Sequence, residues 1–303
     1  MTDQSPPPSE IIVISSQVAR GSVGGRADFV FERLGHRVWF VPTVLLPWHP
    51  GHGLATRIEP SPDDFAAMLA DLGRAPWLPN VGAIVSGYLG SGSQAAPIAG
   101  LVRALKAVNP SALFLCDPVI GDEGGLYVPE ATGQAVRDEL LPLADLVTPN
   151  ITELGWLSGR SVSSVTEVVQ VARALGPARV AVTSVPAMLR GKIATLLVDG
   201  GESASDQVLV AENNRLPPPE GSHVFSGTGD VFAALLLDKL LAKVPAETAL
   251  RHAVAGTYEV LIRSAHTGED ELDLVGSQDR FVHPMAMVDV RRLAVPRETE
   301  EIR

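Results

Sequence analysis

The sequence predicts a doubly wound α/β domain, with a mostly parallel central sheet, helices on both of its faces and a small antiparallel edge. Three observations indicate this fold class. Residues 11–14 read Ile-Ile-Val-Ile, a continuous β-branched run typical of a parallel strand buried on both faces. Similar runs alternate along the chain with segments whose apolar residues recur at helical spacing. Neither an internal repeat nor a break in composition divides the chain, so we expect one domain.

The predicted elements follow one another from residue 11 to residue 264. Strands are expected at residues 11–14, 37–41, 83–86, 112–116, 146–148 and 179–183, followed by an antiparallel pair at 193–199 and 207–212. Helices are expected at residues 27–34, 63–72, 93–108, 131–140, 165–175, 228–242 and 246–264. Gly35 ends the first helix, Asn109-Pro110 ends the third, and Ser164 with Glu167 forms a capping box that begins the fifth.

Composition excludes several classes of function. The net charge of −11 argues against a nucleic-acid or anionic-membrane partner. The single cysteine, Cys116, excludes an intrachain disulfide, and we expect it to be a buried, inert thiol. No apolar run approaches the roughly 20 residues that a membrane helix needs, and residues 1–10 do not resemble a signal peptide. We expect a cytoplasmic protein with a disordered tail at residues 1–9 and one domain at 10–303.

The sequence Gly227-Thr228-Gly229-Asp230 stands at the start of a strongly apolar helix. Two glycines allow a tight turn, and the first amides of a helix form an anion site because they have no acceptor within the helix. An anion site beside a carboxylate suits phosphoryl transfer to an alcohol, with the carboxylate as the base. The alternative is an ordinary glycine-rich turn, in which Asp230 only interacts favourably with the positive end of the helix dipole.

Polar residues follow five of the predicted strands. Ligands bind at the carboxyl ends of the strands in an open α/β sheet. The clusters there are Ser15-Ser16-Gln17, Ser86-Gly87-Tyr88, Asp117-Pro118-Val119, Thr148-Pro149-Asn150 and Thr183-Ser184. Together with residues 227–230 they favour an enzyme over the ordinary turn.

Four segments give the chain a resemblance to a known family. They are Ser86-Gly87-Tyr88-Leu89-Gly90-Ser91, Cys116-Asp117-Pro118-Val119-Ile120-Gly121, Thr148-Pro149-Asn150-Ile151-Thr152-Glu153-Leu154 and Gly227-Thr228-Gly229-Asp230. From about residue 11 to 280 the chain resembles the pyridoxal kinases, which are ribokinase-like small-molecule kinases. The resemblance implies a ribokinase-like fold and ATP-dependent phosphorylation of the 5′-hydroxymethyl group of pyridoxal, and extends to pyridoxine and pyridoxamine.

The resemblance also implies roles for the catalytic and nucleotide-binding residues. Asp230 matches the base, and Gly227, Thr228 and Gly229 match the anion hole around the γ-phosphate. The nucleotide side comprises Asp117, Thr148, Asn150, Glu153, Thr183, Ser184, Arg215 and Leu216, together with Thr228 and Gly229. Asp117 and Glu153 match positions near Mg²⁺, which binds with ATP, and K⁺ is a further candidate cation. For Asn150 and Glu153 the alternative is a capping box. Residues 213–218 match the family's mobile flap over ATP, with Arg215 as its cation, and the alternative for the prolines at 217–219 is a plain linker.

On the substrate side, Ser16 matches the hydroxyl that bonds the ring nitrogen, and Thr43 and Tyr88 match pocket walls. The loop at residues 45–53 departs from the commoner family pattern, since Pro50 and His52 replace a threonine and a tyrosine. His49 is a candidate substrate contact, and a loop histidine without such a role is the alternative.

Three other readings of the function compete with pyridoxal kinase. Hydroxymethylpyrimidine kinases commonly have a sequence that resembles Gly-Thr-Gly-Cys, with a cysteine at the position of Asp230 in this chain. A sugar kinase usually inserts lid strands, for which the ten or so residues between Ile14 and Gly24-Gly25 leave little room. A silent nucleotide-binding protein would bind ATP without turnover. Because a short connection exposes the edge of the site, we expect a second copy of the chain to shield it as a homodimer.

Overall fold

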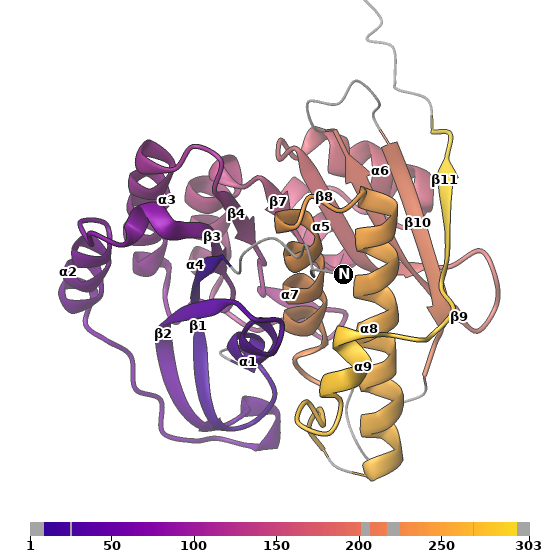
Figure 1. Ribbon diagram of the computed structural model, residues 1–303, viewed down its shortest axis with the longest axis horizontal. Helices are drawn as coiled ribbons and strands as arrows, with labels where there is room; N and C mark the ends of the chain where they lie inside the picture. Colours follow the sequence, from indigo (N-terminus) through magenta and orange to yellow (C-terminus); the bar gives the residue numbers. More distant parts are fainter. Residues whose placement is uncertain (1–8, 25, 201–206, 217–224, 269, 296–303) are drawn as a thin grey trace, which may run out of the picture.

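The computed structural model describes residues 9–24, 26–200, 207–216, 225–268 and 270–295. Within these residues a nine-stranded sheet has the order β11-β10-β9-β8-β7-β4-β3-β1-β2. Neighbouring strands are parallel from β2 to β8 in this order. From β8 through β9 and β10 to β11, each strand is antiparallel to the next. This confirms the predicted mostly parallel sheet with an antiparallel edge (Figure 1).

The elements agree closely with the predicted order. The strands are β1 Glu10–Arg20, β2 Arg37–Trp48, β3 Val81–Ser86, β4 Leu113–Cys116, β5 Gly121–Asp122, β6 Gly125–Leu126, β7 Leu146–Val147, β8 Arg179–Pro186, β9 Lys192–Asp199, β10 Gln207–Asn214 and β11 Asp289–Leu293. The helices are α1 Arg26–Arg33, α2 Pro62–Leu72, α3 Ala95–Val108, α4 Glu130–Ala135, α5 Ile151–Ser158, α6 Val165–Ala174, α7 Thr228–Leu241, α8 Ala246–Thr267 and α9 Gln278–Val282. The β5–β6 hairpin, α5, α9 and β11 were not among the predicted elements. The capping box of Ser164 and Glu167 is present at the start of α6.

The first two strands are longer than predicted. β1 pairs with β3 only as far as Ile14 opposite Ser86, but its pairing with β2 continues, across an irregularity between Ser15 and Gln17, to Arg20 opposite Trp48. The two strands therefore extend beyond the sheet as a two-stranded ribbon (Figure 1). The prediction that Ser15-Ser16-Gln17 follows the first strand was wrong, because these residues lie within it. Among the described residues no strand is inserted between β1 and α1, yet the ribbon itself occupies this edge.

Helices cover both faces of the sheet. On one face α1, α7 and α8 pack on inward residues such as Ile11, Val13 and Leu115. The opposite face carries α2 and α3 over β1, β3 and β4, and α5 and α6 over β8 to β10. As predicted, α7 is buried on nearly every side, with Leu235, Leu236 and Leu237 at 0% exposure. Cys116 is buried, and this burial raises the pKa of its thiol to about 12.

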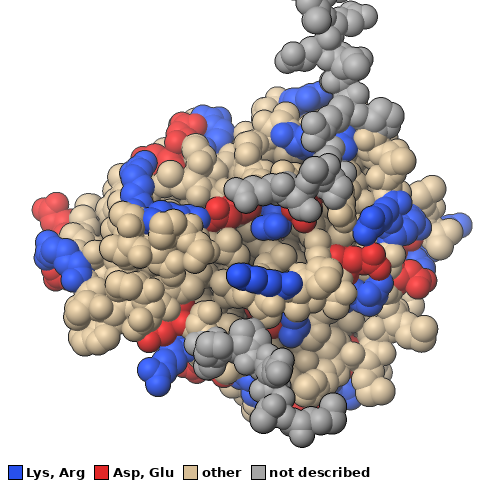
Figure 2. All heavy atoms as spheres, turned by 45° about the horizontal axis from the view of Figure 1, so that its top comes forward, with Lys and Arg blue, Asp and Glu red and all other residues tan. Residues whose placement is uncertain are grey.

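The surface carries charges of both signs. On the face shown in Figure 2, Lys and Arg side chains are interspersed with Asp and Glu, and the described residues form no continuous basic area there. Every helix in the described ranges is too short or too polar to span a lipid bilayer.

Close packing of α8 on α7 requires a glycine. A Cβ atom at Gly256 would lie 2.7 Å from Leu235 Cδ1 and 3.4 Å from the Phe281 backbone, whereas a Cβ atom at Gly100 in α3 would meet no atom within 4 Å. We expect Gly256→Val to lower the free energy of unfolding by about 1–3 kcal/mol through overpacking. The control Gly100→Val should change it by less than about 0.5 kcal/mol. Urea denaturation of both variants measures this, and equal losses would contradict the packing argument.

Candidate active site

A small cavity lies at the carboxyl ends of β1 and β3. The chain leaves β1 for β2 on one side and returns to β3 on the other, so this is the point where the strand order reverses and where such sheets bind ligands. The side chains of Asp117 and Asp230 both line the cavity. Its full lining is Val13, Ser15, Gly24, Phe31, Val85, Gly87, Asp117, Asp230, Ala233 and Ala234. The structure thus brings two of the predicted acidic residues to one cavity.

The loop before α7 has the geometry of an anion site. Gly227 has φ of 89°, and a Cβ atom there would lie 2.1 Å from the Ser22 carbonyl oxygen, so only glycine fits. The helix begins at Thr228, and its first intrahelical bond runs from the Val231 amide to the Gly227 carbonyl at 3.1 Å. The amides of the preceding residues have no acceptor within α7 and lie at the positive end of its dipole. This confirms the predicted glycine turn at a helix start.

Asp230 is a half-buried carboxylate whose surroundings favour the protonated form. Burial raises its pKa to about 7, although a hydrogen bond from the Gly24 amide to Oδ2 at 3.1 Å acts in the opposite direction. Gly24 has φ of 61°, and a Cβ atom there would lie 2.3 Å from Ser16 Oγ. Glycine is therefore needed for this amide to reach Asp230. A carboxylate with a pKa near neutrality is well suited to accept a proton at physiological pH.

Asp117 lies across the cavity from the start of α7. It is 7% exposed, and the Thr148 hydroxyl donates a hydrogen bond to its Oδ1 at 3.0 Å. Burial, together with repulsion from Asp230 and Glu153, raises the pKa of Asp117 well above its ordinary value. A Cβ atom at Gly229 would be 3.9 Å from Asp117 Oδ2, so the start of α7 lies close to this carboxylate. Three acidic side chains therefore share one region and repel one another.

Asn150 and Glu153 form the capping box of α5. The Asn150 side chain accepts from the Glu153 amide, and Glu153 Oε2 accepts from the Asn150 amide, both at 2.9 Å. Glu153 Oε1 also accepts from the amides of Ile120 and Gly121, at 2.9 and 3.3 Å. Burial still raises the pKa of Glu153 to about 7. The capping interpretation is confirmed, and the predicted contact with Mg²⁺ remains a prediction.

The remaining predicted nucleotide residues lie at the ends of β8 and β10. Thr183 and Ser184 occupy a bulge of β8, where Ser184 has φ of 59°, a conformation that is uncommon for residues other than glycine and is enriched at functional sites. Arg215 follows β10, is exposed, and donates its amide to the Gly191 carbonyl at 2.8 Å, with Leu216 next in the chain. The proposed flap prolines at 217–219 lie outside the described residues.

The predicted substrate residues lie along the ribbon, with Ser16 and Thr43 near its base and His49 at its tip. Thr43 is buried and donates its hydroxyl to the Tyr88 carbonyl at 2.7 Å. His49 accepts from the Gly51 amide at 3.1 Å and so caps a short helical turn, while burial lowers the pKa of its imidazole. Ser16 is 4% exposed, and its neighbour Ser15 lines the cavity instead. The predicted contact of Ser16 with the substrate remains a prediction, and the serine that lines the cavity is Ser15.

The sequence analysis did not identify Arg57, which contacts the predicted pocket residue Tyr88. Its guanidinium lies 5.7 Å from the centre of the Tyr88 ring and donates to the Tyr88 hydroxyl at 3.1 Å and to the Gly90 carbonyl at 2.6 Å. The loop that carries it has no regular structure, so no periodicity could have pointed to Arg57. Among the described residues, no group of three or more histidine, cysteine or acidic side chains is arranged to hold a metal ion.

Comparison with known proteins places these features in a family. Residues 80–274 match the family model described as phosphomethylpyrimidine kinase. The chain is 36% identical over 291 residues to a pyridoxal kinase PdxY of Leifsonia xyli, with 94% of this chain and 99% of the relative covered. A second pyridoxal kinase PdxY, from Rubrobacter xylanophilus, is 36% identical over 292 residues, covering 94% and 97% of the two chains. The structure of pyridoxal kinase from Leishmania donovani in complex with ADP and pyridoxamine superposes with a TM-score of 0.86 at 25% identity, covering 94% of this chain and all of that one.

The raised pKa of Asp230 predicts a pH-dependent cost to stability. Its pKa is about 7 in the folded chain and near 3.8 when unfolded, so stability is lost as pH rises through this interval. We expect Asp230→Asn to raise the free energy of unfolding by about 1–3 kcal/mol at pH 8, and to have little effect near pH 4. Urea denaturation of both proteins at the two pH values measures the difference. A gain that is equal at both pH values would contradict the electrostatic explanation.

Proposed function

This chain belongs to the pyridoxal kinase family, and we propose that it transfers the γ-phosphate of ATP to the 5′-hydroxymethyl group of pyridoxal, with Asp230 as general base. The observation that carries the proposal is the cavity lined by both Asp117 and Asp230. There the Asp230 carboxylate lies at the start of α7, beside residues 227–229, which we call the anion loop. The base and the phosphate-binding amides then come from the same turn of one buried helix, so an alcohol that reaches Asp230 also lies next to the transferring group.

The proposed reaction proceeds by in-line transfer. The pyridoxal hydroxyl gives its proton to Asp230, its oxygen forms a bond to the γ-phosphorus, and the bond from phosphorus to the bridging oxygen of ADP breaks. Amides of Gly227, Thr228 and Gly229 stabilise the charge on the γ-phosphoryl oxygens. A pKa of about 7 allows Asp230 to hold this proton until the product leaves.

A cation fits the acidic character of the site. Burial, together with repulsion from Asp230 and Glu153, raises the pKa of Asp117, so a positive charge beside it would favour the ionised form. We propose that Asp117 holds the Mg²⁺ that accompanies ATP, and that Glu153 acts through bound water because its oxygens already accept three backbone amides. Magnesium supplies charge neutralisation of the phosphates. Thr148, Asn150, Thr183, Ser184, Arg215 and Leu216 are proposed to contact the nucleotide, and K⁺ is proposed as an accessory cation.

The pyridine ring is proposed to bind between the ribbon and Tyr88. Ser16 would bond the ring nitrogen, Tyr88 would offer its aromatic face, and Thr43 and His49 would complete the pocket wall. Arg57 holds the Tyr88 ring in place from the side of its hydroxyl. We further propose that the protein acts in the cytoplasm as a homodimer, with the ribbon at or near the contact between copies.

A hydroxymethylpyrimidine kinase is the second candidate, favoured by the description of the matching family model. Both substrates present a hydroxymethyl group on a flat heteroaromatic ring, so the same base could serve either. A coupled assay with pyridoxal, pyridoxine, pyridoxamine, hydroxymethylpyrimidine and ribose, each with Mg-ATP, distinguishes them. The highest kcat/KM for a pyridine substrate supports the proposal, and the highest value for hydroxymethylpyrimidine or ribose overturns it.

Loss of the base should affect turnover far more than nucleotide binding. We expect Asp230→Asn to lower kcat by about 10²–10⁴-fold and to leave the Kd for ATP nearly unchanged, because only the proton acceptor is removed. Asp238→Asn is the control, since it neutralises another carboxylate of α7 that bonds His36 away from the cavity. It should retain kcat within about twofold. Normal turnover by Asp230→Asn would exclude Asp230 as the base.

The two adjacent serines of β1 can be tested against each other. We expect Ser16→Ala to raise KM for pyridoxal by about three- to tenfold with little change in KM for ATP, because one neutral hydrogen bond to the ring is lost. Ser15→Ala is the matched control, since its hydroxyl accepts from the Tyr88 amide at 3.2 Å within the protein. If only Ser15→Ala raises KM for pyridoxal, the ring contact belongs to Ser15. Equal effects on both substrates would mean that the pocket is misplaced.

A further inference from the structure

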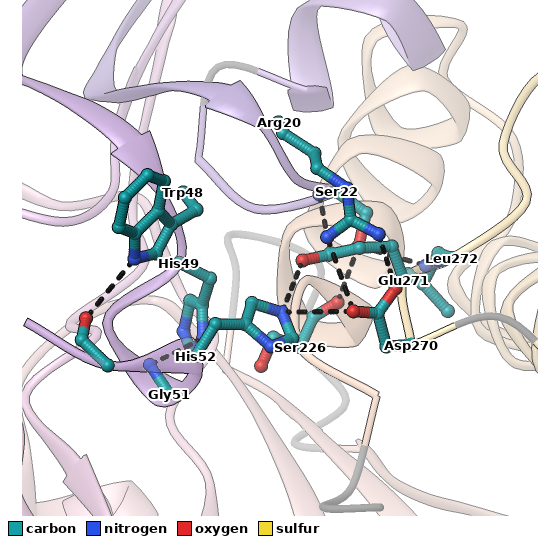
Figure 3. A network of polar contacts seen from close by, with 11 residues as sticks. Arg20, Ser22, Trp48, His49, Gly51, His52, Ser226, Asp270, Glu271 and Leu272 are labelled. Atoms are coloured by element: carbon teal, nitrogen blue, oxygen red, sulfur yellow. Dashed lines mark hydrogen bonds and ion pairs between the residues drawn. The ribbon is translucent and has the colours of Figure 1, made fainter. Parts of the chain in front are cut away.

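Glu271 is a buried carboxylate, 8% exposed, in the segment between α8 and α9. Its Oε2 accepts hydrogen bonds from both the amide and the hydroxyl of Ser22, at 2.8 and 2.7 Å. Its Oε1 lies 3.1 Å from His52 Nε2. Figure 3 shows the carboxylate between these two partners, which come from opposite sides of it. Glu271 therefore contacts two segments that lie more than 200 residues earlier in the chain.

Ser22 connects Glu271 to the anion loop. The single proton of its hydroxyl is shared between Glu271 Oε2 at 2.7 Å and the Ser226 carbonyl oxygen at 3.0 Å, and the hydroxyl oxygen accepts from the Leu272 amide at 3.0 Å. A Cβ atom at Gly227 would lie 2.1 Å from the Ser22 carbonyl oxygen, so the two backbones are in direct contact. Two residues after Ser22, the Gly24 amide bonds Asp230. The segment that Glu271 holds is thus the same segment that packs against both ends of the anion loop.

His52 connects Glu271 to the substrate side. It ends the short helical turn Pro50–His52 that follows β2, and its ring contacts that of His49 at a centroid distance of 6.1 Å. Its Nε2 also lies 3.7 Å from Asp270, which pairs with Arg20 at the end of β1. Through Glu271, the tip of the ribbon is therefore joined to the loop that precedes the base (Figure 3).

We propose that Glu271 is a positioning residue for phosphoryl transfer, which fixes the Gly227–Asp230 loop through Ser22 and ties it to the ribbon through His52. The inference rests on the proposed function and adds to it a residue that touches neither substrate nor nucleotide. A charged acceptor is suited to this role because it makes stronger hydrogen bonds than a neutral one and serves three donors at once. Anion-hole amides and a base must be held closely, since misplacement of about 1 Å can cost a factor of about 10² in rate.

The first test measures kcat and both KM values for Glu271→Ala and Glu271→Gln. We expect Glu271→Ala to lower kcat by about 10²-fold, with KM for ATP changed by less than about threefold. Glu271→Gln keeps an oxygen that accepts from Ser22. Its kcat should therefore be at least about tenfold higher than that of Glu271→Ala. Asp279→Asn is the control, because it makes the same change of charge at an exposed carboxylate that pairs with Arg33. A brace that serves only stability would instead lower the Tm and leave the kcat of the folded enzyme unchanged.

A double-mutant cycle tests the connection through Ser22. Ser22→Ala removes the hydroxyl that bonds Glu271 and Ser226, so its effect on kcat should not add to that of Glu271→Ala. Fully additive effects, or a kcat of folded Glu271→Ala within about twofold of wild type, would overturn the proposal. If Glu271→Ala does not fold, Glu271→Gln combined with Ser22→Ala gives the same test.

A second measurement separates this inference from the proposed function. Hydrogen exchange of the peptides covering residues 225–235 reports the order of the loop without reference to activity. We expect faster exchange there in Glu271→Ala, and unchanged exchange in Asp279→Asn. An active wild type whose Glu271→Ala variant shows normal kcat and normal exchange contradicts only the role of Glu271. A wild type that phosphorylates none of the tested substrates contradicts the function, while exchange still decides whether Glu271 orders the loop.

Discussion

The site depends on how the chain buries α7. This helix lies between α1 and α8 on one face of the sheet, with apolar side chains on nearly every side, and its first turn borders the cavity beside β1 and β3. Asp230 is carried there by the helix and is partly removed from water. Burial favours its protonated form, and the Gly24 amide offsets part of that effect. The reactivity proposed for Asp230 therefore follows from the packing of an apolar helix.

The sequence predicted the order and type of the main elements because buried strands and amphipathic helices leave strong periodic patterns. It predicted the Gly227–Asp230 loop and the acidic residue Asp117 because both follow strands or begin helices in recognisable ways. The ends of β1 and β2 were missed, since the ribbon is half-exposed and interrupted by Pro42 and Pro47, which weaken the strand pattern. Arg57 and Glu271 were missed because their partners lie far away in the chain, and no local spacing encodes such contacts.

Three carboxylates, those of Asp117, Glu153 and Asp230, give the site its electrostatic character. Burial raises the pKa of each of the three, and repulsion from Asp230 and Glu153 adds to the rise at Asp117. Because burial disfavours an ionised carboxylate, this arrangement lowers the stability of the folded chain as the pH rises to neutrality and above. Glu153 accepts hydrogen bonds from the backbone amides of Ile120, Gly121 and Asn150, whereas the Asp117 carboxylate accepts one from the Thr148 hydroxyl. This difference is the reason that we propose direct cation binding for Asp117 and an indirect role for Glu153.

The two outer strands of the sheet carry features that discourage pairing with a strand of a second copy. In β2, Pro42 and Pro47 have no amide hydrogen to offer, and Leu45 already exchanges backbone hydrogen bonds with Ile58. At the opposite margin, β11 carries Asp289, Arg291 and Arg292. Neither margin invites a further strand, because one lacks donors and the other presents charge. Both margins of the described sheet therefore disfavour the addition of a strand from a second copy, which limits edge-to-edge aggregation.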